Sequence, residues 1–203
     1  MLLSMTSTAT DTTAPATSPV PELKAAGVNS MLKVLRDSIT PAELLALQRV
    51  LPPPSVSLIT RPRLAQEWVP LEHVAPIYET SLRVTFKGDA QKLYELGRQQ
   101  LRNDMSGIYR VFMRVASPWY VADKTASIYA VYARHCGTLE LVRRGERQLE
   151  FLLAKRPYPS HAFFESLRGS VAGALELTGV KDVVVSTIGE PSADSRLFRA
   201  SWK

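Results

Sequence analysis

TLELVRRGERQLEFLLA (residues 138–154) is the stretch that decides the fold. Two runs in which apolar and polar side chains alternate flank a short turn, Arg143–Arg147, that contains a glycine. Alternation with a period of two is typical of a strand with one buried face. Two such runs around a glycine-containing turn predict a β-hairpin.

The rest of the C-terminal part indicates one helix and two further strands, in PSHAFFESLRGSVAGALELTG (159–179), KDVVVSTIG (181–189) and SRLFRASW (195–202). Gly179 is expected to end the helix, because glycine adopts the left-handed conformation of the residue after a helix C-cap. Phe198, Ala200 and Trp202 share one face of the last strand, since side chains alternate along a strand. The order β-β-α-β-β predicts a four-stranded antiparallel sheet.

Before the hairpin, the hydrophobic spacing is mainly helical and predicts about five helices. The clearest boundary is Thr40, with Pro41 at the first helical position and Glu43 completing a capping box. Three prolines, Pro52–Pro54, are expected to stop that helix, and residues 55–66 to form an irregular link. Further helices are predicted in the segments 22–39, 71–86, 90–104, 107–116 and 117–136. The predicted class is α+β, with an N-terminal helical layer packed on the C-terminal sheet.

The composition indicates one domain behind a leader. Residues 1–21 are rich in Ser, Thr, Ala and Pro and are expected to be disordered, whereas residues 22–203 are expected to form a single α+β domain. The single cysteine allows no internal disulfide, which fits a reducing cytoplasm. No window approaches the 18 or so apolar residues of a membrane span. We therefore expect a cytoplasmic domain.

The net charge of +6 comes mostly from scattered arginines. Nucleic-acid binders concentrate such charge on one face or carry a known motif, and neither signal is present. A role in nucleic-acid binding is not expected. The chain also lacks a Walker loop, a dinucleotide-binding fingerprint, a GxSxG elbow and an HExxH helix, so no catalytic set is predicted.

His135 and Cys136 place an imidazole beside the only thiol. On a continuing helix the two side chains lie about 100° apart, which is poor geometry for a nucleophile and its base. His73 and His161 stay open as bases that the fold brings close. One cysteine and three dispersed histidines are too few for a zinc site, so no metal is expected. Cys136 is expected to pack in the core, with His135 near a helix end.

Gly169 and Gly173 form a small-residue stripe, with Ala172 between them, on the predicted C-terminal helix. The stripe predicts close packing of that helix on the sheet, with room for a ligand as the alternative.

Five segments taken together resemble a known superfamily: WVPLEHVAPIYETSLRVTF (68–86), KLYELGRQQLRNDMSGIYRVFMRVASPWYV (92–121), IYAVYARHCGTLELV (128–142), LRGSVAGALELTGVKDVVV (167–185) and FRASW (198–202). They are similar to a deltaproteobacterial (myxobacterial) family related to the haem–NO-binding domains, the 4-vinyl-reductase domains and the trafficking-complex subunits. The resemblance covers roughly residues 25–202. It implies a helical layer over a four-stranded antiparallel sheet, with an apolar pocket between the two layers.

The haem-binding branch carries a proximal histidine on a helix and a Tyr-x-Ser-x-Arg motif. Here the series from Tyr78 through Ser81 to Arg83 is off by one residue, which turns the tyrosine by about 100° on a helix. The surroundings of His135 do not match the proximal helix. We therefore expect no cofactor, and His135 is the residue to test as a haem ligand.

The resemblance leads to a functional hypothesis. We expect a non-catalytic, small-apolar-ligand-binding or sensing domain that acts through a protein partner, as a homodimer or with another chain. The resemblance implies that the pocket is lined by Trp68, Tyr78, Trp119, Tyr132 and Cys136. Two alternatives stay open: an enzyme or enzyme accessory of the 4-vinyl-reductase type, with Cys136 or a histidine at the base of a cleft, and a haem-based gas sensor.

Overall fold

The computed structural model describes residues 19–105, 108–158, 160–189 and 194–203. Most of the expected leader, residues 1–18, therefore lies outside the described part. The helices are α1 (Ala25–Ser38), α2 (Pro41–Val50), α3 (Pro53–Thr60), α4 (Leu71–Thr80), the π-helix η1 (Ser81–Thr85), α5 (Ala90–Asp104), α6 (Ile108–Val115), α7 (Pro118–Tyr132) and α8 (His161–Glu176). The strands are β1 (Glu22–Lys24), β2 (Trp68–Pro70), β3 (Ala133–Arg134), β4 (Thr138–Arg144), β5 (Gln148–Ala154), β6 (Val184–Ile188) and β7 (Arg196–Ser201).

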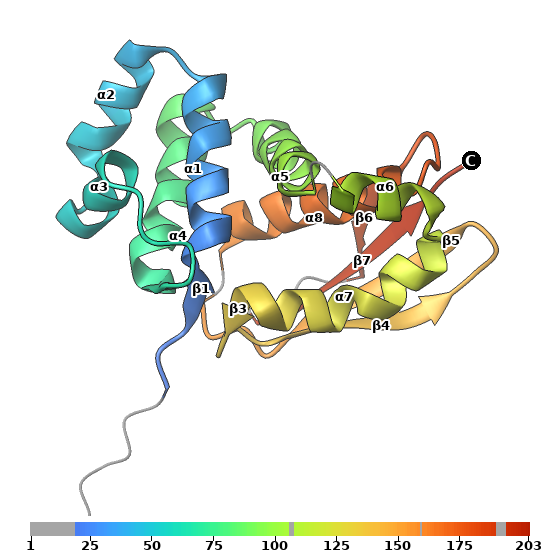
Figure 1. Cartoon of the computed structure of the whole chain (residues 1–203). Helices are drawn as coiled ribbons and strands as arrows, with labels where there is room; N and C mark the ends of the chain where they lie inside the picture. Colours follow the sequence, from blue (N-terminus) through green and yellow to red (C-terminus); the bar gives the residue numbers. More distant parts are fainter. Residues whose placement is uncertain (1–18, 106–107, 159, 190–193) are drawn as a thin grey trace, which may run out of the picture.

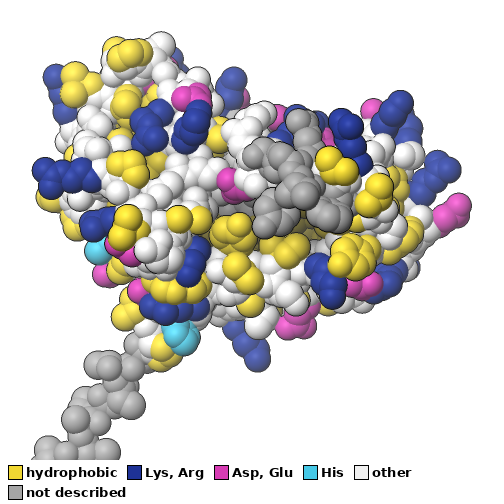
Figure 2. Space-filling model, in the orientation of Figure 1, with side chains coloured by type: hydrophobic (Ala, Val, Ile, Leu, Met, Phe, Trp, Pro, Cys, Tyr) yellow, Lys and Arg dark blue, Asp and Glu magenta, His cyan; other side chains and the backbone are white. Residues whose placement is uncertain are grey.

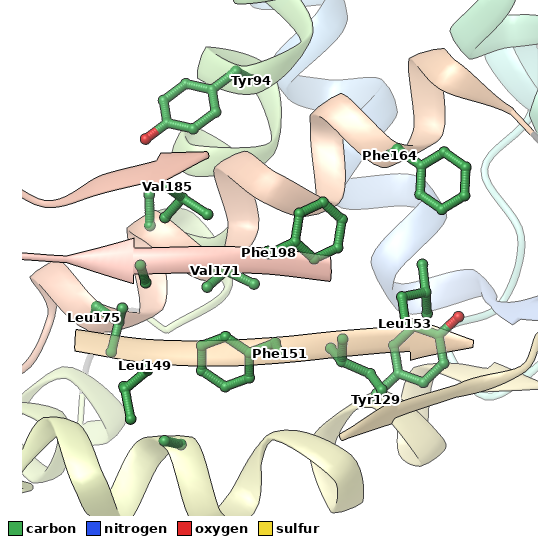
Figure 3. Packing of buried hydrophobic residues seen from close by; sticks show 14 of the residues in the cluster. Tyr94, Tyr129, Leu149, Phe151, Leu153, Phe164, Val171, Leu175, Val185 and Phe198 are labelled. Atoms are coloured by element: carbon green, nitrogen blue, oxygen red, sulfur yellow. The ribbon is translucent and has the colours of Figure 1, made fainter. Parts of the chain in front are cut away.

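The predicted C-terminal sheet is confirmed. Four antiparallel strands pair in the order β4-β5-β7-β6, with α8 connecting the two hairpins. Figure 3 shows Leu149, Phe151 and Leu153 in a row along β5, as expected for alternate residues of a strand. Phe151 pairs with Phe198 of β7, and both side chains are buried. The alternation in the sequence therefore identified the buried face correctly.

One hydrophobic cluster, called the sheet core here, joins this face of the sheet to α7 and α8 (Figures 1 and 3). Its buried members include Tyr129, Leu139, Leu149, Phe151, Leu153, Phe164, Val171, Leu175, Val185 and Phe198. A second cluster, called the helical core, lies among α1 to α5 and the start of α8. Its buried members include Val28, Met31, Leu32, Leu35, Leu47, Leu58, Ile77, Tyr78, Leu93 and Phe163. Leu23 and Leu167 pack against both cores.

The N-terminal helices agree with the sequence in part. The capping box of α2 is present, with Thr40 and Glu43 bonded to each other's backbone amides. The expected irregular link after the prolines is wrong, because Pro53 and Pro54 start α3. Proline fits the first turn of a helix, where the amide that it lacks has no intrahelical acceptor. The same residues that end one helix therefore begin the next.

A small second sheet ties the two ends of the helical layer together. Its order is β2-β1-β3, and Leu23 of β1 pairs with Val69 on one side and Ala133 on the other. Residues 22–24 were expected to begin a helix, but they form this central strand instead. The two partner strands are far away in the sequence, so no local pattern reveals the pairing.

The two helices α5 and α8 cross at very short range. A Cβ built on Gly169 would lie 1.8 Å from the carbonyl oxygen of Tyr94, and one on Gly97 would lie 1.9 Å from that of Ser166. Only glycine permits such an approach. Arg98 and Arg102 of α5 add ion pairs to Glu176 of α8. The small-residue stripe thus serves packing, as expected, but its partner is α5 and not the sheet.

Candidate functional site

A cavity of about 200 Å³ lies where the sheet core meets the helical core. Its wall combines residues of both cores with side chains from α5, α6 and α7. The apolar lining residues include Leu23, Val28, Leu101, Met105, Met113, Val121, Ile128, Ala133, Leu139, Phe151, Phe163, Leu167, Val171, Ala174 and Leu175. Lys24, Gln100, Asp104, Thr125, Ser166, Ser170 and three tyrosines add polar groups. A mainly apolar wall with a few polar groups is the usual build of a small-molecule site.

The cavity brings together two of the five pocket residues expected from the sequence. Tyr78 of α4 and Tyr132 at the end of α7 both line it. Trp68 lies on the small sheet instead, where its ring contacts Lys24 and Arg134, each 4.5 Å from the ring centroid.

The other two expected residues belong to packing arrangements outside the lining. Trp119 packs against Trp202, with their ring centroids 5.3 Å apart. Cys136 is 1% exposed and belongs to the sheet core. The sequence placed these aromatic residues among the helices, but it carried no information on which of them face a common space.

The tyrosine hydroxyls of the cavity are un-ionised at neutral pH. Burial raises the pKa of Tyr78 to about 12, although Ser166 and Arg156 oppose the shift. Burial also raises the pKa of Tyr129, whose hydroxyl donates a hydrogen bond of 3.0 Å to the carbonyl oxygen of Cys136. The same physical cause raises the pKa of Asp104, since a charged carboxylate is poorly solvated there.

His135 and Cys136 do not form a reactive pair. The helix α7 ends at Tyr132, and His135 follows β3 with a positive φ of 55° and an exposed side chain. The helix that was expected to reach residue 136 therefore ends earlier, and His135 lies beyond it, where the chain turns through His135 and Gly137 to enter β4. The thiol of Cys136 lies 3.4 Å from the carbonyl oxygen of Glu22, and burial raises its pKa. A reactive thiolate requires the opposite shift.

Arg156 is the residue that sequence reasoning missed. It follows β5 and is 3% exposed, and its three guanidinium nitrogens have no hydrogen-bond partner within the described residues. The guanidinium lies 4.1 Å from the ring centroid of Phe163, which lines the cavity, and 4.8 Å from that of Phe164. In the sequence Arg156 lies within the run AKRP (154–157), where a basic residue looks like a solvated strand end.

The charged residues elsewhere do not form an extended site. Figure 2 shows Lys and Arg side chains spread over the visible face, with acidic side chains among them. Within the described ranges, no group of three or more His, Cys, Asp or Glu side chains is placed to hold a metal ion. No helix in the same ranges is long and apolar enough to cross a membrane.

Comparison with known proteins gives the fold. No family model matches the sequence, and no curated protein matches it. Among solved structures, a Cs H-NOX mutant with an unnatural amino acid matches 89% of this chain and 97% of its own, with a TM-score of 0.65 and 14% identity. An Fe(II) unliganded H-NOX protein from K. algicida gives the same coverage, with a TM-score of 0.66 and 10% identity.

A third match is an oxygen-binding H-NOX domain related to soluble guanylate cyclases, in its oxygen complex. It has a TM-score of 0.60 and 15% identity, over 89% of this chain and 95% of that one. The chain therefore has the H-NOX fold, which confirms the resemblance to the haem–NO-binding superfamily at the level of fold. The myxobacterial family stays a prediction.

These matches contradict the expectation of a domain without a cofactor. The H-NOX structures of this fold include studies of haem distortion and of haem redox potential. The sequence argument rested on the one-residue offset in the series Tyr78–Arg83 of α4 and η1, and a short motif of this kind does not report the fold, which the whole chain defines.

The apolar wall and a nearby cation suit haem, whereas the usual histidine or cysteine ligand of the iron is missing from the described lining. The apolar wall suits a flat hydrophobic ring, and the guanidinium of Arg156, which lies behind the wall at Phe163, suits a carboxylate. No histidine or cysteine is among the lining residues, and His135 lies outside the cavity. The lining does offer phenols and thioethers, which also ligate haem iron in proteins. A porphyrin, being much larger than benzene, also requires the cavity to widen.

Proposed function

We propose that this chain is a sensing domain that binds a small, mainly apolar molecule between its helical layer and its sheet, and reports occupancy to a protein partner. The observation that carries the proposal is the cavity at the junction of the two cores. Its volume of about 200 Å³ is slightly larger than the ~150 Å³ cavity that accommodates benzene in an engineered protein. It is smaller than the ~300–1,000 Å³ of drug-sized sites, so the geometry favours a ligand of about eight to ten heavy atoms.

Helix α6 is placed to transmit the binding of a ligand in the cavity to a protein partner. Met113 lines the cavity from this helix, whereas Val111 and Val115 are 64% and 81% exposed. Neighbouring apolar side chains with this exposure are typical of an interaction surface. A shift of α6 on ligand binding would therefore change the surface that the partner contacts, whether that partner is a second copy or another protein.

Toluene is a suitable first probe, because it is apolar and small enough for the cavity. We expect saturating toluene to raise the melting temperature of the full chain, since a ligand that binds only the folded state stabilises it. Native mass spectrometry of freshly purified protein tests for a retained natural ligand. No shift with toluene, together with an empty mass, would refute ligand binding and leave a pure interaction module.

Haem-based gas sensing is the second candidate, supported by the H-NOX fold and by the unpaired cation beside the cavity. When bound, haem would supply the iron that holds a diatomic gas. The side chains that offer iron ligands at the cavity are Tyr78, Tyr129, Tyr132, Met105 and Met113. A Soret band that saturates at one haemin per chain would favour this candidate over a small ligand, and a linear, unsaturated titration would reject it.

A further inference from the structure

Arg156 is a buried cation whose guanidinium has no hydrogen-bonded or ion-paired carboxylate among the described residues. Its backbone amide donates to the carbonyl oxygen of Asp194 at 2.9 Å, which fixes the loop between β5 and α8. The side chain is 3% exposed, yet Nε, Nη1 and Nη2 all lack a hydrogen-bond partner in the described part of the chain. A buried charge without a counter-charge is strongly destabilising, because the protein interior solvates it poorly.

Other arginines of the same region are paired, so the isolation of Arg156 is specific. Arg168 of α8 donates to the carboxylate of Glu165 at 2.6 Å and to the carbonyl oxygen of Val185 at 2.7 Å. Arg199 of β7 donates to Glu150 at 2.9 Å. Arg156 has none of these contacts, although it is more deeply buried than either.

Aromatic rings position the guanidinium without satisfying its N–H groups. The ring centroids of Phe163 and Phe164 lie 4.1 and 4.8 Å from its central carbon. Such cation–π contacts attract the guanidinium but leave the donors at its edge free. The surroundings therefore attract an anion.

The guanidinium lies behind the cavity wall and is not itself among the lining residues. Phe163 lines the cavity and contacts it directly, and Tyr78 and Tyr129, two further lining residues, interact with it electrostatically. The apolar wall and the unpaired cation are therefore neighbouring parts of one site. A planar guanidinium binds a carboxylate through two parallel hydrogen bonds, which satisfies several of its donors at once.

We infer that the natural ligand is a small organic acid, whose hydrocarbon part lies in the cavity and whose carboxylate is bound by Arg156. This inference rests on the proposed ligand-binding function and names its ligand class. It explains why a buried charge is retained without an internal partner, since the ligand supplies the counter-ion. A neutral molecule of the same shape leaves the guanidinium unpaired and binds more weakly.

Octanoate and octanamide are a matched pair of probes, because they differ mainly in charge. Titration calorimetry on the full chain should show octanoate binding about 30-fold more tightly, in line with a charge-assisted bidentate pair. In Arg156→Met the preference should fall to about onefold through the loss of octanoate affinity alone. Arg156→Lys keeps the charge but not the planar fork, so it should retain part of the preference.

Stability of the unliganded protein separates a ligand-binding role from a structural one. Arg156→Met removes an unpaired buried charge and should leave the melting temperature unchanged or raise it. The matched control Arg168→Met removes a paired guanidinium and leaves Glu165 buried without its partner, so it should lower the melting temperature. A large loss of stability in Arg156→Met would assign Arg156 to the structure and overturn the inference.

The outcomes also separate this inference from the function on which it rests. Equal affinity for octanoate and octanamide in the wild-type chain overturns the acid ligand while the cavity stands as a binding site. Binding of toluene without binding of octanoate also overturns the acid ligand and leaves the cavity as a binding site. Failure of all three probes refutes the ligand-binding function itself.

Discussion

The helical core and its junction with the sheet core are built from the same apolar residue types, but they are packed differently. Leu35 and Leu47 of the helical core are fully buried and lie outside the cavity lining. At the junction, residues from both cores surround about 200 Å³ of space. Protein interiors are normally packed as densely as organic crystals. The same residue types therefore enclose Leu35 and Leu47 completely in one region and leave space in the other.

The crossing of α5 and α8, which forms one side of the junction, should be the most sensitive point. Gly169→Ala places a Cβ 1.8 Å from the backbone carbonyl oxygen of Tyr94, so the two helices have to separate. We expect a loss of about 4 kcal/mol in the free energy of unfolding, measured by urea denaturation. In Gly145→Ala the nearest atom is 3.5 Å away, and the change should stay within about 0.5 kcal/mol. Equal effects of the two substitutions would refute the close crossing.

The filled core should respond as a packed interior. Leu47→Ala removes a side chain that is 0% exposed, and it should cost about 3 kcal/mol through lost burial and a new cavity. Leu45 lies on the same helix and is 49% exposed, so Leu45→Ala is the matched control and should cost less than about 1 kcal/mol. A similar cost for both would show that α2 does not pack as described.

Tyr78 belongs to the helical core and also lines the cavity. Its burial should make the free energy of unfolding depend on pH in the alkaline range. Its pKa is about 12 in the folded protein and about 10 when unfolded, so the unfolded chain loses the proton first. Its contribution is complete below pH 10 and is lost as the pH rises to about 12, an effect of about 3 kcal/mol. Urea denaturation between pH 9 and 12 should show a shallower decline for Tyr78→Phe. Tyr120→Phe, at an exposed tyrosine, should leave the wild-type slope unchanged.

Filling the cavity should have the smallest effect and the opposite sign. Ala174→Leu adds apolar volume to the cavity wall and should raise the free energy of unfolding by about 1 kcal/mol while weakening toluene binding. Ala130 is exposed on α7, so Ala130→Leu should change neither quantity measurably. A destabilised Ala174→Leu variant that still binds toluene would show that the ligand occupies another place.

The sequence predicted the helices and strands better than it predicted the contacts between them. The hairpin at residues 138–154, the capping box at Thr40 and the closing strand with Phe198 all follow from signals within about ten residues. The helix α3 was missed, because Pro53 was interpreted only as a stop and proline is also a good first residue of a helix. His135 was misplaced because the turn into β4 depends on its pairing with β5.

The sequence predicted the kind of site, an apolar pocket, but not most of the residues that form it. An apolar pocket between helices and sheet followed from the resemblance, and Tyr78 and Tyr132 were among the residues expected to line it. Trp68 and Trp119 have the same chemistry, but they pack against Arg134 and Trp202, which are distant in the sequence. Arg156 carries no local signal, because burial of a charge is a property of the surrounding fold.

Local sequence signals were sufficient for most of the helices, for the strands of the four-stranded sheet and for its buried face, since hydrophobic periodicity and capping act over a few residues. Tertiary structure alone decided the pairing of β1 with β2 and β3, the contact of α5 with α8 through glycine, and the cavity between the two cores. It also decided that the guanidinium of Arg156 is enclosed without a counter-ion. These features depend on which distant segments meet, and that is set by the packing of the whole chain.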